Sequence, residues 1–219
     1  MRCLAWNVRG MCDSSKARSV GSPLHMNKVS LAGILETRIK KHLILQVASK
    51  IDMQWQWVSN ARFHNRVRIL VGWSPDVLEV QVVQDHLQFV HCEVRVKQSN
   101  DIFFCTFVYG VNSLSGTKDL WKGLCDISRN MDDPWLILGD FNVVYDYSHR
   151  DNGRAVSNYE IKNFKDCIEE AQLVIPPSVG HWFSWHNKEC GERRIMSRID
   201  HGFYNLLWVD KGFNLVVQY

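Results

Sequence analysis

Four apolar stretches of the sequence each end at a side chain that could bind or activate a ligand. The residues at or just beyond these ends are Asn7, Glu36, Tyr109 with Asn112, and Asp140 with Asn142. In α/β sheets the ligand-binding residues converge at strand ends, so these groups are predicted to share one site. Two carboxylates with carboxamide oxygens suit Mg²⁺ or Mn²⁺ rather than zinc. Such a site favours phosphate-ester hydrolysis, in which the cation neutralises developing charge.

Each of these residues has an ordinary structural explanation when it is taken alone. Asn7 precedes Arg9 and a glycine, which is typical of a turn, and Glu36 on its own resembles a solvated surface acid. Asp140 also lies among common turn residues. The functional interpretation therefore depends on their joint order along the chain.

The composition is that of an ordinary globular protein. Its 219 residues are 46% hydrophobic and 22% charged, enough to bury the core of one large domain or two small ones. A net charge of +3 does not by itself imply a polyanionic partner. Three local basic clusters indicate nucleic acid more directly, although a solvated surface explains each equally well. They comprise Arg38, Lys40 and Lys41; Arg62, Arg66 and Arg68; and Arg193, Arg194 and Arg198.

Neither a membrane segment nor a metal-binding cysteine pattern is visible. No stretch approaches the ~18 apolar residues that a membrane helix needs, and the N-terminus has no secretory signal. The seven cysteines are scattered and include no C-x-x-C pair. We therefore expect reduced thiols in an intracellular protein with no membrane partner.

Hydrophobic patterning predicts strands alternating with helices. Buried strands are expected at 2–7 and 29–35, and a central strand at 102–108, where both faces are apolar. A half-exposed antiparallel hairpin is expected at 78–82 and 90–96, with its turn at 84–86.

Two helices are predicted from apolar residues at helical spacing, and the second opens with the capping-box pair Ser157 and Glu160. Their apolar positions are Leu120, Leu124, Ile127 and Met131, and Ile161, Phe164, Ile168 and Ala171. The order of elements favours a mixed α/β fold with helices packed on sheets. Neither G-x-G-x-x-G nor G-x-x-x-x-G-K-[ST] occurs, which argues against a doubly wound nucleotide-binding fold.

Six short motifs occur in an order that resembles one known superfamily. They are WNVRG (6–10), LETR (35–38), YGVN (109–112), LGDFN (138–142), FSWHN (183–187) and SRIDHGF (197–203). In sequence and spacing they resemble the endonuclease/exonuclease/phosphatase superfamily, which includes deoxyribonuclease I and the apurinic/apyrimidinic endonucleases. The first motif and the last two are most similar to the endonuclease domain of plant LINE-type non-LTR retrotransposons. The resemblance covers residues 1–219 as one domain and implies a four-layer α/β sandwich, two packed β-sheets flanked by helices.

The resemblance also implies a role for each matched residue. Glu36 would be the principal ligand of Mg²⁺ or Mn²⁺, with Asn7 assisting through water. Asp140 would orient or activate the water nucleophile, and Asn142 would hold Asp140 and the scissile phosphate. The residues expected to bind phosphate or substrate are Tyr109, Asn112, Arg38, Trp185 and Arg198. Arg9 stands where repair-type relatives carry an acid. Trp185 is also explained as a core residue, and Arg198 as an ion-pair partner of Asp200.

One motif of the superfamily is missing from the sequence. Asp200 of SRID would orient a histidine of a later Ser-Asp-His motif, which does not occur in residues 1–219. His201 is not expected to replace it, because neighbouring strand residues point to opposite faces. Surface positions are expected for His149, His181 and His186. We therefore expect a sheet that lacks its last strand or strands and a chain with little or no activity, since losing one member of a cooperative catalytic set costs orders of magnitude in rate.

Two further features are consistent with a decayed element. Pro23 falls where the superfamily has its first helix, and an interior proline costs about 3 kcal/mol or more. No reverse-transcriptase segment follows the endonuclease motifs in this sequence. The leading hypothesis is a DNA endonuclease, expected to be monomeric and nuclear if functional. The alternatives are a non-catalytic nucleic-acid-binding remnant and a phosphatase of the same superfamily.

Overall fold

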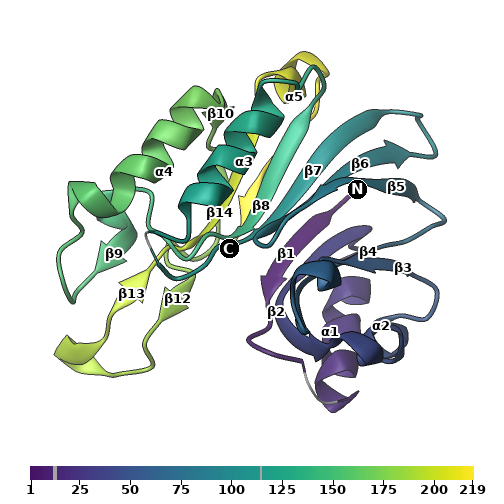
Figure 1. Cartoon of the computed structure of the whole chain (residues 1–219), viewed down its shortest axis with the longest axis horizontal. Coiled ribbons are helices and arrows are strands. Elements are labelled where there is room, and N and C mark those ends of the chain that lie inside the picture. Colours follow the sequence, from purple (N-terminus) through teal and green to yellow (C-terminus); the bar gives the residue numbers. More distant parts are fainter. Residues whose placement is uncertain (12–13, 114) are drawn as a thin grey trace. The chain divides into compact units, whose positions relative to one another are not determined.

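The computed structural model describes residues 1–11, 14–113 and 115–219. The chain forms two compact units, each of which is described by itself. Unit 1 comprises Met1–Tyr109 and Leu138–Asp140, and unit 2 comprises Gly110–Ile137 and Phe141–Tyr219. The elements follow the sequence colours in Figure 1.

Unit 1 contains a four-stranded sheet in the order β1-β2-β4-β3. Its strands are β1 (Cys3–Asn7), β2 (Leu31–Lys40), β3 (Gln56–Ser59) and β4 (Arg66–Trp73). β1 runs parallel to β2, whereas β4 runs antiparallel to both β2 and β3. The sheet is therefore mixed.

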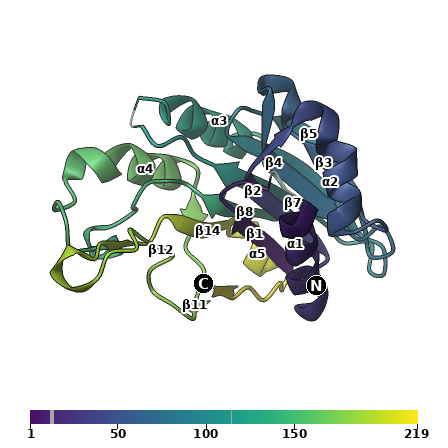
Figure 2. The ribbon, with the colours of Figure 1, turned by 90° about the horizontal axis from the view of Figure 1, so that it is seen from below.

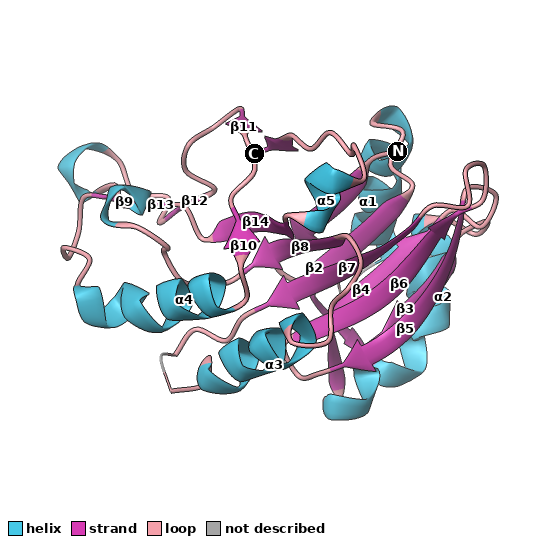
Figure 3. Ribbon diagram, turned by 90° about the horizontal axis from the view of Figure 1, so that it is seen from above, coloured by secondary structure: helices cyan, strands magenta, loops and turns pink. Residues whose placement is uncertain are grey.

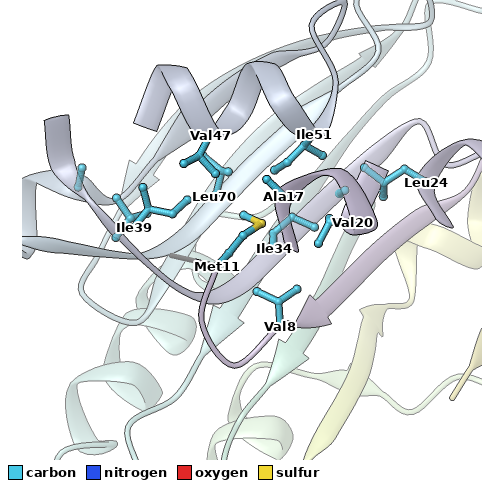
Figure 4. Close-up of a cluster of buried hydrophobic side chains, with 13 residues drawn as sticks. Val8, Met11, Ala17, Val20, Leu24, Ile34, Ile39, Val47, Ile51 and Leu70 are labelled. Atoms are coloured by element: carbon cyan, nitrogen blue, oxygen red, sulfur yellow. The ribbon is translucent and has the colours of Figure 1, made fainter. Parts of the chain in front are cut away.

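Helices α1 (Ser14–Met26) and α2 (Ile44–Ile51) cover one face of this sheet. Val20 and Leu24 of α1, Val47 and Ile51 of α2, and Ile34 of the sheet belong to one cluster of hydrophobic side chains (Figure 4). All five are buried. Burying a side chain of this size contributes roughly 1.5–3 kcal/mol, so this contact fixes the sheet that carries Asn7 and Glu36.

The opposite face of the four-stranded sheet packs on the second-sheet strands that belong to unit 1. These are β5 (Leu78–Asp85), β6 (Phe89–Val96) and β7 (Ile102–Tyr109), which pair antiparallel in that order. A Cβ on Gly33 of β2 would lie 2.1 Å from the Phe107 ring, so a glycine is required where β2 and β7 approach. The predicted hairpin and central strand are confirmed, although the turn lies at 86–88 rather than at 84–86.

The second sheet has six strands in the order β10-β14-β8-β7-β6-β5. Its other strands are β8 (Trp135–Asp140), β10 (Leu173–Val174) and β14 (Asp200–Asn205). Every residue of β8 is buried, as the apolar run predicts. The predicted α/β sandwich of two sheets flanked by helices is confirmed.

In unit 2, α3 (Lys118–Ser128) and α4 (Asn158–Glu170) lie side by side (Figure 3). Trp121 of α3 and Phe164 of α4 stack with ring centroids 4.7 Å apart, and Phe203 of β14 meets Phe164 at 5.6 Å. The predicted capping box at Ser157 and Glu160 is present with both of its hydrogen bonds. Met131 lies beyond the end of α3, so the first predicted helix is one turn shorter than its pattern.

The rest of unit 2 consists of short elements. Its strands are β9 (Arg150–Asp151), β11 (Ser178–Val179), β12 (Trp185–His186), β13 (Met196–Ser197) and β15 (Val217–Gln218), and its last helix is α5 (Leu207–Asp210). β12, β13 and β9 form a three-stranded sheet, and β11 pairs with β15 near the C-terminus (Figure 2).

Two expectations about unit 1 need correction. The second apolar strand does not end at Glu36, because β2 continues to Lys40 through a bulge. Pro23 does not interrupt the first helix but lies near its C-terminal end. Because Pro23 has no backbone N–H, the carbonyl of Ser19 lacks its helical hydrogen-bond donor. Ser19 is exposed, so water can donate to that carbonyl instead. Within the described residues, no helix combines the length and apolar character needed to cross a membrane.

Candidate active site

Glu36 is positioned by the bulge in β2. The pairing register with β4 shifts between Leu35 and Ile39, and Glu36 and Arg38 both adopt positive φ, 52° and 55°. Such backbone costs on the order of 1 kcal/mol or more for each non-glycine residue, so the surroundings must enforce it. The hydroxyl of buried Thr37 donates to the Val67 carbonyl of β4 at 2.8 Å and fastens the middle of the bulge.

The loop after β1 fastens the bulge from its other side. The backbone N–H groups of Val8, Gly10 and Met11 donate to the carbonyls of residues 35, 36 and 37, at 3.1, 2.7 and 2.6 Å. Gly10 has φ of +94°, which side chains rarely adopt, so glycine is favoured there. Met11 is fully buried in the unit 1 core, which anchors the loop. The motif WNVRG therefore positions both Asn7 and Glu36.

Thr37→Val is expected to destabilise the protein by about 1–3 kcal/mol, because the buried Val67 carbonyl loses its donor. Urea unfolding followed by circular dichroism measures this change. Thr37→Ser keeps the hydroxyl and serves as the control. Equal stability of the Val and Ser variants would show that the hydrogen bond does not hold the bulge.

Asp140 is the last residue of β8 and is only 3% exposed. A Cβ on the preceding Gly139 would lie 2.0 Å from the Val108 carbonyl oxygen, so glycine lets β8 approach β7 at this point. The Asn7 side-chain amide donates to Asp140 Oδ2 at 2.6 Å. Asn7 Oδ1 in turn accepts the Arg9 backbone N–H at 2.9 Å, which fixes the orientation of the amide.

Tyr109, the last residue of β7, belongs to the same electrostatic neighbourhood. Burial raises the pKa of its phenol, and the charges of Glu36 and Asp140 raise this pKa further. Arg68 of β4 acts in the opposite direction, with its guanidinium 5.6 Å from the centre of the Tyr109 ring. Because the pKa is raised, the phenol stays protonated at neutral pH and can donate a hydrogen bond. Unit 1 thus brings together four of the predicted residues, Asn7, Glu36, Tyr109 and Asp140.

The chemistry of these donors fits a magnesium ion. Glu36 is 8% exposed, and its carboxylate pairs with the guanidinium of Arg38, whose side chain is 56% exposed. Among the described residues, no group of three His, Cys, Asp or Glu side chains is placed to hold a metal ion. Mg²⁺ needs no such group, because it commonly binds through one or two carboxylates and retains several waters. Glu36, Asp140 and the amide oxygen of Asn7 are donors of this kind.

Unit 2 contains the remaining residues of the YGVN and LGDFN motifs. Asn142 has a φ of 54°, and its side-chain amide donates to the Gly110 carbonyl at 2.7 Å. A Cβ on Gly110 would lie 2.3 Å from the Phe141 carbonyl oxygen, so these two segments are in close contact. Asn112 is exposed on the segment that begins at Gly110. The two predicted asparagines therefore belong to adjoining segments.

The last two motifs are joined by a serine that the sequence analysis did not single out. The hydroxyl of Ser184 accepts the backbone N–H groups of Ile199 and Asp200, both at 3.1 Å. This bond fixes the backbone at Asp200, the first residue of β14. Trp185 is half-buried and lies opposite Ser197 in the β12–β13 pair. The roles predicted for Asp200 and Trp185 stay predictions.

Arg198 is 3% exposed and lies between two aromatic rings. Its guanidinium carbon is 4.7 Å from the centre of the Trp182 ring and 4.2 Å from that of Tyr219. One of its terminal nitrogens lies 3.4 Å from the Ser178 hydroxyl. These contacts explain its position by packing, and its predicted contact with substrate stays a prediction.

One of the three unit 2 histidines expected at the surface, His149, is buried. His181 and His186 are exposed, but His149 is 7% exposed and meets the rings of Trp182 and His201 at 5.4 Å. His201 is buried among aromatic rings, and its Nε2 lies 3.1 Å from the Val143 carbonyl. Burial lowers the pKa of His149 to about 4 and that of His201 to about 3. Both rings are therefore neutral at pH 7.

Comparison with solved structures identifies the fold as that of the endonuclease/exonuclease/phosphatase superfamily, the DNase I-like class. The chain superposes on the endonuclease domain of TRAS1, a telomere-specific non-LTR retrotransposon, with a TM-score of 0.70 and 14% identity, covering 94% of this chain and 86% of that one. An endonuclease/exonuclease/phosphatase family protein from Bacteroides thetaiotaomicron gives 0.64 and 11%, covering 92% and 82%.

A mannosyl-6-phosphatase from Bacteroides thetaiotaomicron superposes with a TM-score of 0.63 and 11% identity, covering 93% of this chain and 84% of that one. At these identities the likeness concerns the fold. No protein-family model matches the sequence, and no curated protein matches it either.

Proposed function

We propose that this chain is a Mg²⁺-dependent phosphodiesterase, a DNA endonuclease domain of the retrotransposon type. The observation that carries the proposal is the hydrogen bond between Asn7 and Asp140 at the ends of β1 and β8. It joins two residues 133 positions apart beside a phenol whose pKa responds to both Glu36 and Asp140. A buried carboxylate oriented by an amide, beside a second carboxylate and a phenol, suits hydrolysis of a phosphate ester better than a structural role.

Each residue of the cluster has a step in the proposed reaction. The Asp140 carboxylate orients a water molecule and accepts its proton, as a general base does. The Asn7 amide keeps that carboxylate in place, and the Tyr109 hydroxyl donates to a phosphate oxygen as negative charge develops. Glu36, assisted by Asn7, would hold the cation. Bound Mg²⁺ supplies neutralisation of the phosphate charge.

Two asparagines complete the proposed phosphate site through the covalent chain. Asn142 follows Asp140 by two residues, so their Cα atoms are separated by no more than about 7 Å. Asn112 follows Tyr109 by three residues and lies on the segment joined to Asn142 through Gly110. We propose that both side chains hydrogen-bond the scissile phosphate and help to stabilise the leaving oxygen.

DNA is the proposed substrate for two reasons. One solved structure with this fold is the endonuclease domain of a telomere-specific non-LTR retrotransposon, and we propose the same kind of substrate for this chain. Exposed cations also follow the site along two paired strands, since Arg38 and Lys40 of β2 lie close to Arg66 of β4. Positive side chains in such a row neutralise backbone phosphates.

The test uses supercoiled plasmid, mannose 6-phosphate and a generic phosphomonoester, each with Mg²⁺, and compares the chain with Asp140→Ala. We expect plasmid nicking above the level of the variant and no release of inorganic phosphate. Phosphate release without nicking would favour a phosphatase. Plasmid binding with nicking equal to that of the variant would favour a non-catalytic nucleic-acid-binding protein. The low rate predicted for this chain stays a prediction that the same assay measures.

Glu36→Gln is expected to raise the Mg²⁺ concentration needed for half-maximal nicking at least about 10-fold, because an amide is a weaker ligand for a hard cation than a carboxylate. The measurement is the nicking rate against Mg²⁺ concentration for both proteins. Glu79→Gln, on the exposed edge strand β5, is the control. An unchanged Mg²⁺ dependence in Glu36→Gln would remove Glu36 from the metal site.

A further inference from the structure

We infer that Cys125 and Cys167 form a modification site: a peroxide converts their two thiols into a disulfide that links α3 to α4. Both helices belong to unit 2, and the inference is independent of the proposed function. In the sequence the two cysteines are 42 positions apart and form no recognisable motif. The structure brings their side chains together.

The two sulfur atoms meet where α3 and α4 lie side by side (Figure 3). Cys125 Sγ lies 3.7 Å from Cys167 Sγ and 3.9 Å from the Cys167 carbonyl oxygen. The Cys167 thiol donates to the Trp121 carbonyl of α3 at 3.6 Å. Both cysteines are in the reduced form. An S–S bond is about 2.05 Å long, so the two sulfurs need to approach each other by only about 1.7 Å.

Contacts in the neighbouring helical turns hold the two cysteines opposite each other. One turn before the pair, the rings of Trp121 and Phe164 stack with centroids 4.7 Å apart. One turn after it, the Arg129 guanidinium pairs with the Glu170 carboxylate at 2.6 Å. Residues three or four positions apart share a helix face, so these contacts continue the line of the thiol pair. The positions of the two sulfurs are therefore set from both sides.

A groove gives a small oxidant access to the thiol pair. Its volume is about 370 Å³, and residues of α3 and α4 line it, including both cysteines. Cys125 is 6% exposed and Cys167 is 3% exposed, so a peroxide that enters the groove meets Cys125 first. Another pair, Cys92 and Cys105, lies opposite each other on β6 and β7, but both are 0% exposed. Access therefore distinguishes the pair on the helices.

The reaction consumes one molecule of hydrogen peroxide. The Cys125 sulfur attacks one peroxide oxygen, the O–O bond breaks, and a sulfenic acid and one water form. The Cys167 sulfur then attacks the sulfur of this sulfenic acid, which releases a second water and leaves the disulfide. Together the two thiols lose two electrons and two protons, and the peroxide is reduced to two waters.

The surroundings of the pair keep both thiols protonated at neutral pH. Burial raises the pKa of the Cys125 thiol, the contact with Cys167 lowers this pKa, and the charge of Glu170 raises it again. Burial also raises the pKa of the Cys167 thiol. The thiolate is the nucleophile, so we expect the pair to stay reduced in air and to react slowly in an excess of peroxide.

The test treats the full chain, folded and reduced, with excess hydrogen peroxide. After the peroxide is removed, the chain is unfolded in N-ethylmaleimide, digested with trypsin without reduction and analysed by mass spectrometry. We expect peptides 123–129 and 166–188, which contain the two cysteines, to be joined with a mass two hydrogens below their sum. Dithiothreitol should separate them. Cys190→Ser, which removes an exposed thiol outside the pair, should give the same joined peptides.

Three results of this experiment would overturn the inference. The first is that N-ethylmaleimide labels both Cys125 and Cys167 after the peroxide treatment. The second is sulfinic or sulfonic acid at either cysteine without the joined peptides. The third is a disulfide from either one to a different cysteine, or between Cys92 and Cys105 instead.

Thermal unfolding provides the second readout. A disulfide between residues 42 positions apart restricts the unfolded chain, so peroxide should raise the unfolding midpoint of the parent by roughly 5–15 °C. Cys125→Ser keeps the size of the side chain but cannot form the bond, and the same treatment should not raise its midpoint. An equal rise in Cys125→Ser would contradict a stabilising link between Cys125 and Cys167.

Discussion

Asp140→Asn is expected to lower the plasmid-nicking rate by about 10³-fold, within the range that a general base contributes. The substituted amide has the shape of the carboxylate, and its oxygen can still accept the Asn7 hydrogen bond that now measures 2.6 Å. The fold should therefore persist, while the group that takes a proton from water is lost. Initial rates with Mg²⁺ in excess measure the effect, and circular dichroism checks the fold.

The matched control for this change is Asp101→Asn. Asp101 is exposed in the turn between β6 and β7 of the same unit, so its substitution should leave the nicking rate unchanged. If Asp140→Asn nicked DNA as fast as Asp101→Asn, Asp140 could not be the base. If both variants lost activity equally, the loss would reflect a general charge effect.

Acid is expected to destabilise the protein strongly between pH 6.5 and pH 4. Burial lowers the pKa of His91 and of His149 to about 4 and that of His201 to about 3, below the unfolded value near 6.5. The charges of His149 and Arg198 also lower the pKa of His201, whereas its backbone hydrogen bonds raise it.

The sign follows from the proton balance between the two states. Below pH 6.5 the unfolded chain binds protons that the folded protein does not. The free energy of unfolding therefore has its full value above pH 6.5 and decreases as the pH falls below it. Each such histidine lowers the free energy of unfolding by about 1.4 kcal/mol for every pH unit across this window. Two or three of them together approach the total stability of a typical domain, about 5–15 kcal/mol.

The measurement is the free energy of unfolding by urea at several pH values from 8 to 4.5. His201→Phe should show a smaller loss per pH unit than the parent, even if it is less stable at neutral pH because the Val143 carbonyl loses its partner. His42→Phe changes an exposed histidine and should keep the slope of the parent. An unchanged slope in His201→Phe would mean that His201 is not kept neutral by burial.

Much of the fold could be predicted from the sequence because local patterning and burial agree. The sequence has an apolar stretch that ends at Asp140, which favours a strand end there, and every residue of β8 up to Asp140 is buried. The capping-box pair Ser157 and Glu160 marks the start of α4. In both places the signal is local, and nothing from the tertiary structure overrides it.

The bulge at Glu36 could not be predicted in this way. Its sequence, LETR, shows an apolar run reaching a charged residue, which favours a strand end. The strand continues because Thr37 bonds the Val67 carbonyl and because three backbone groups of the loop after Asn7 bond the bulge. These partners lie about 25–30 positions away along the chain, beyond the reach of local periodicity.

The site could be predicted only as a set of strand ends. The Asn7–Asp140 bond confirms that two of those ends meet. The charges of Asp140 and Glu36 act on Tyr109, which is a third strand end, whereas Glu36 itself lies in the bulge inside β2. The sequence did not distinguish Arg68 from Arg66, because the two arginines occupy alternate positions of the same strand, β4. The position of Arg68 near the Tyr109 ring becomes visible only once β4 and β7 are placed in the structure.

The most direct test of the central claim follows the oxygen of the attacking water. A short DNA duplex is incubated with the chain and Mg²⁺ in H₂¹⁸O, and the phosphate-bearing fragment is analysed by mass spectrometry. Hydrolysis by a water that Asp140 activates predicts one ¹⁸O in the newly released phosphate end, with no such product from Asp140→Asn. Cleavage products without ¹⁸O, or labelled product in equal amount from the variant, would contradict the proposed reaction.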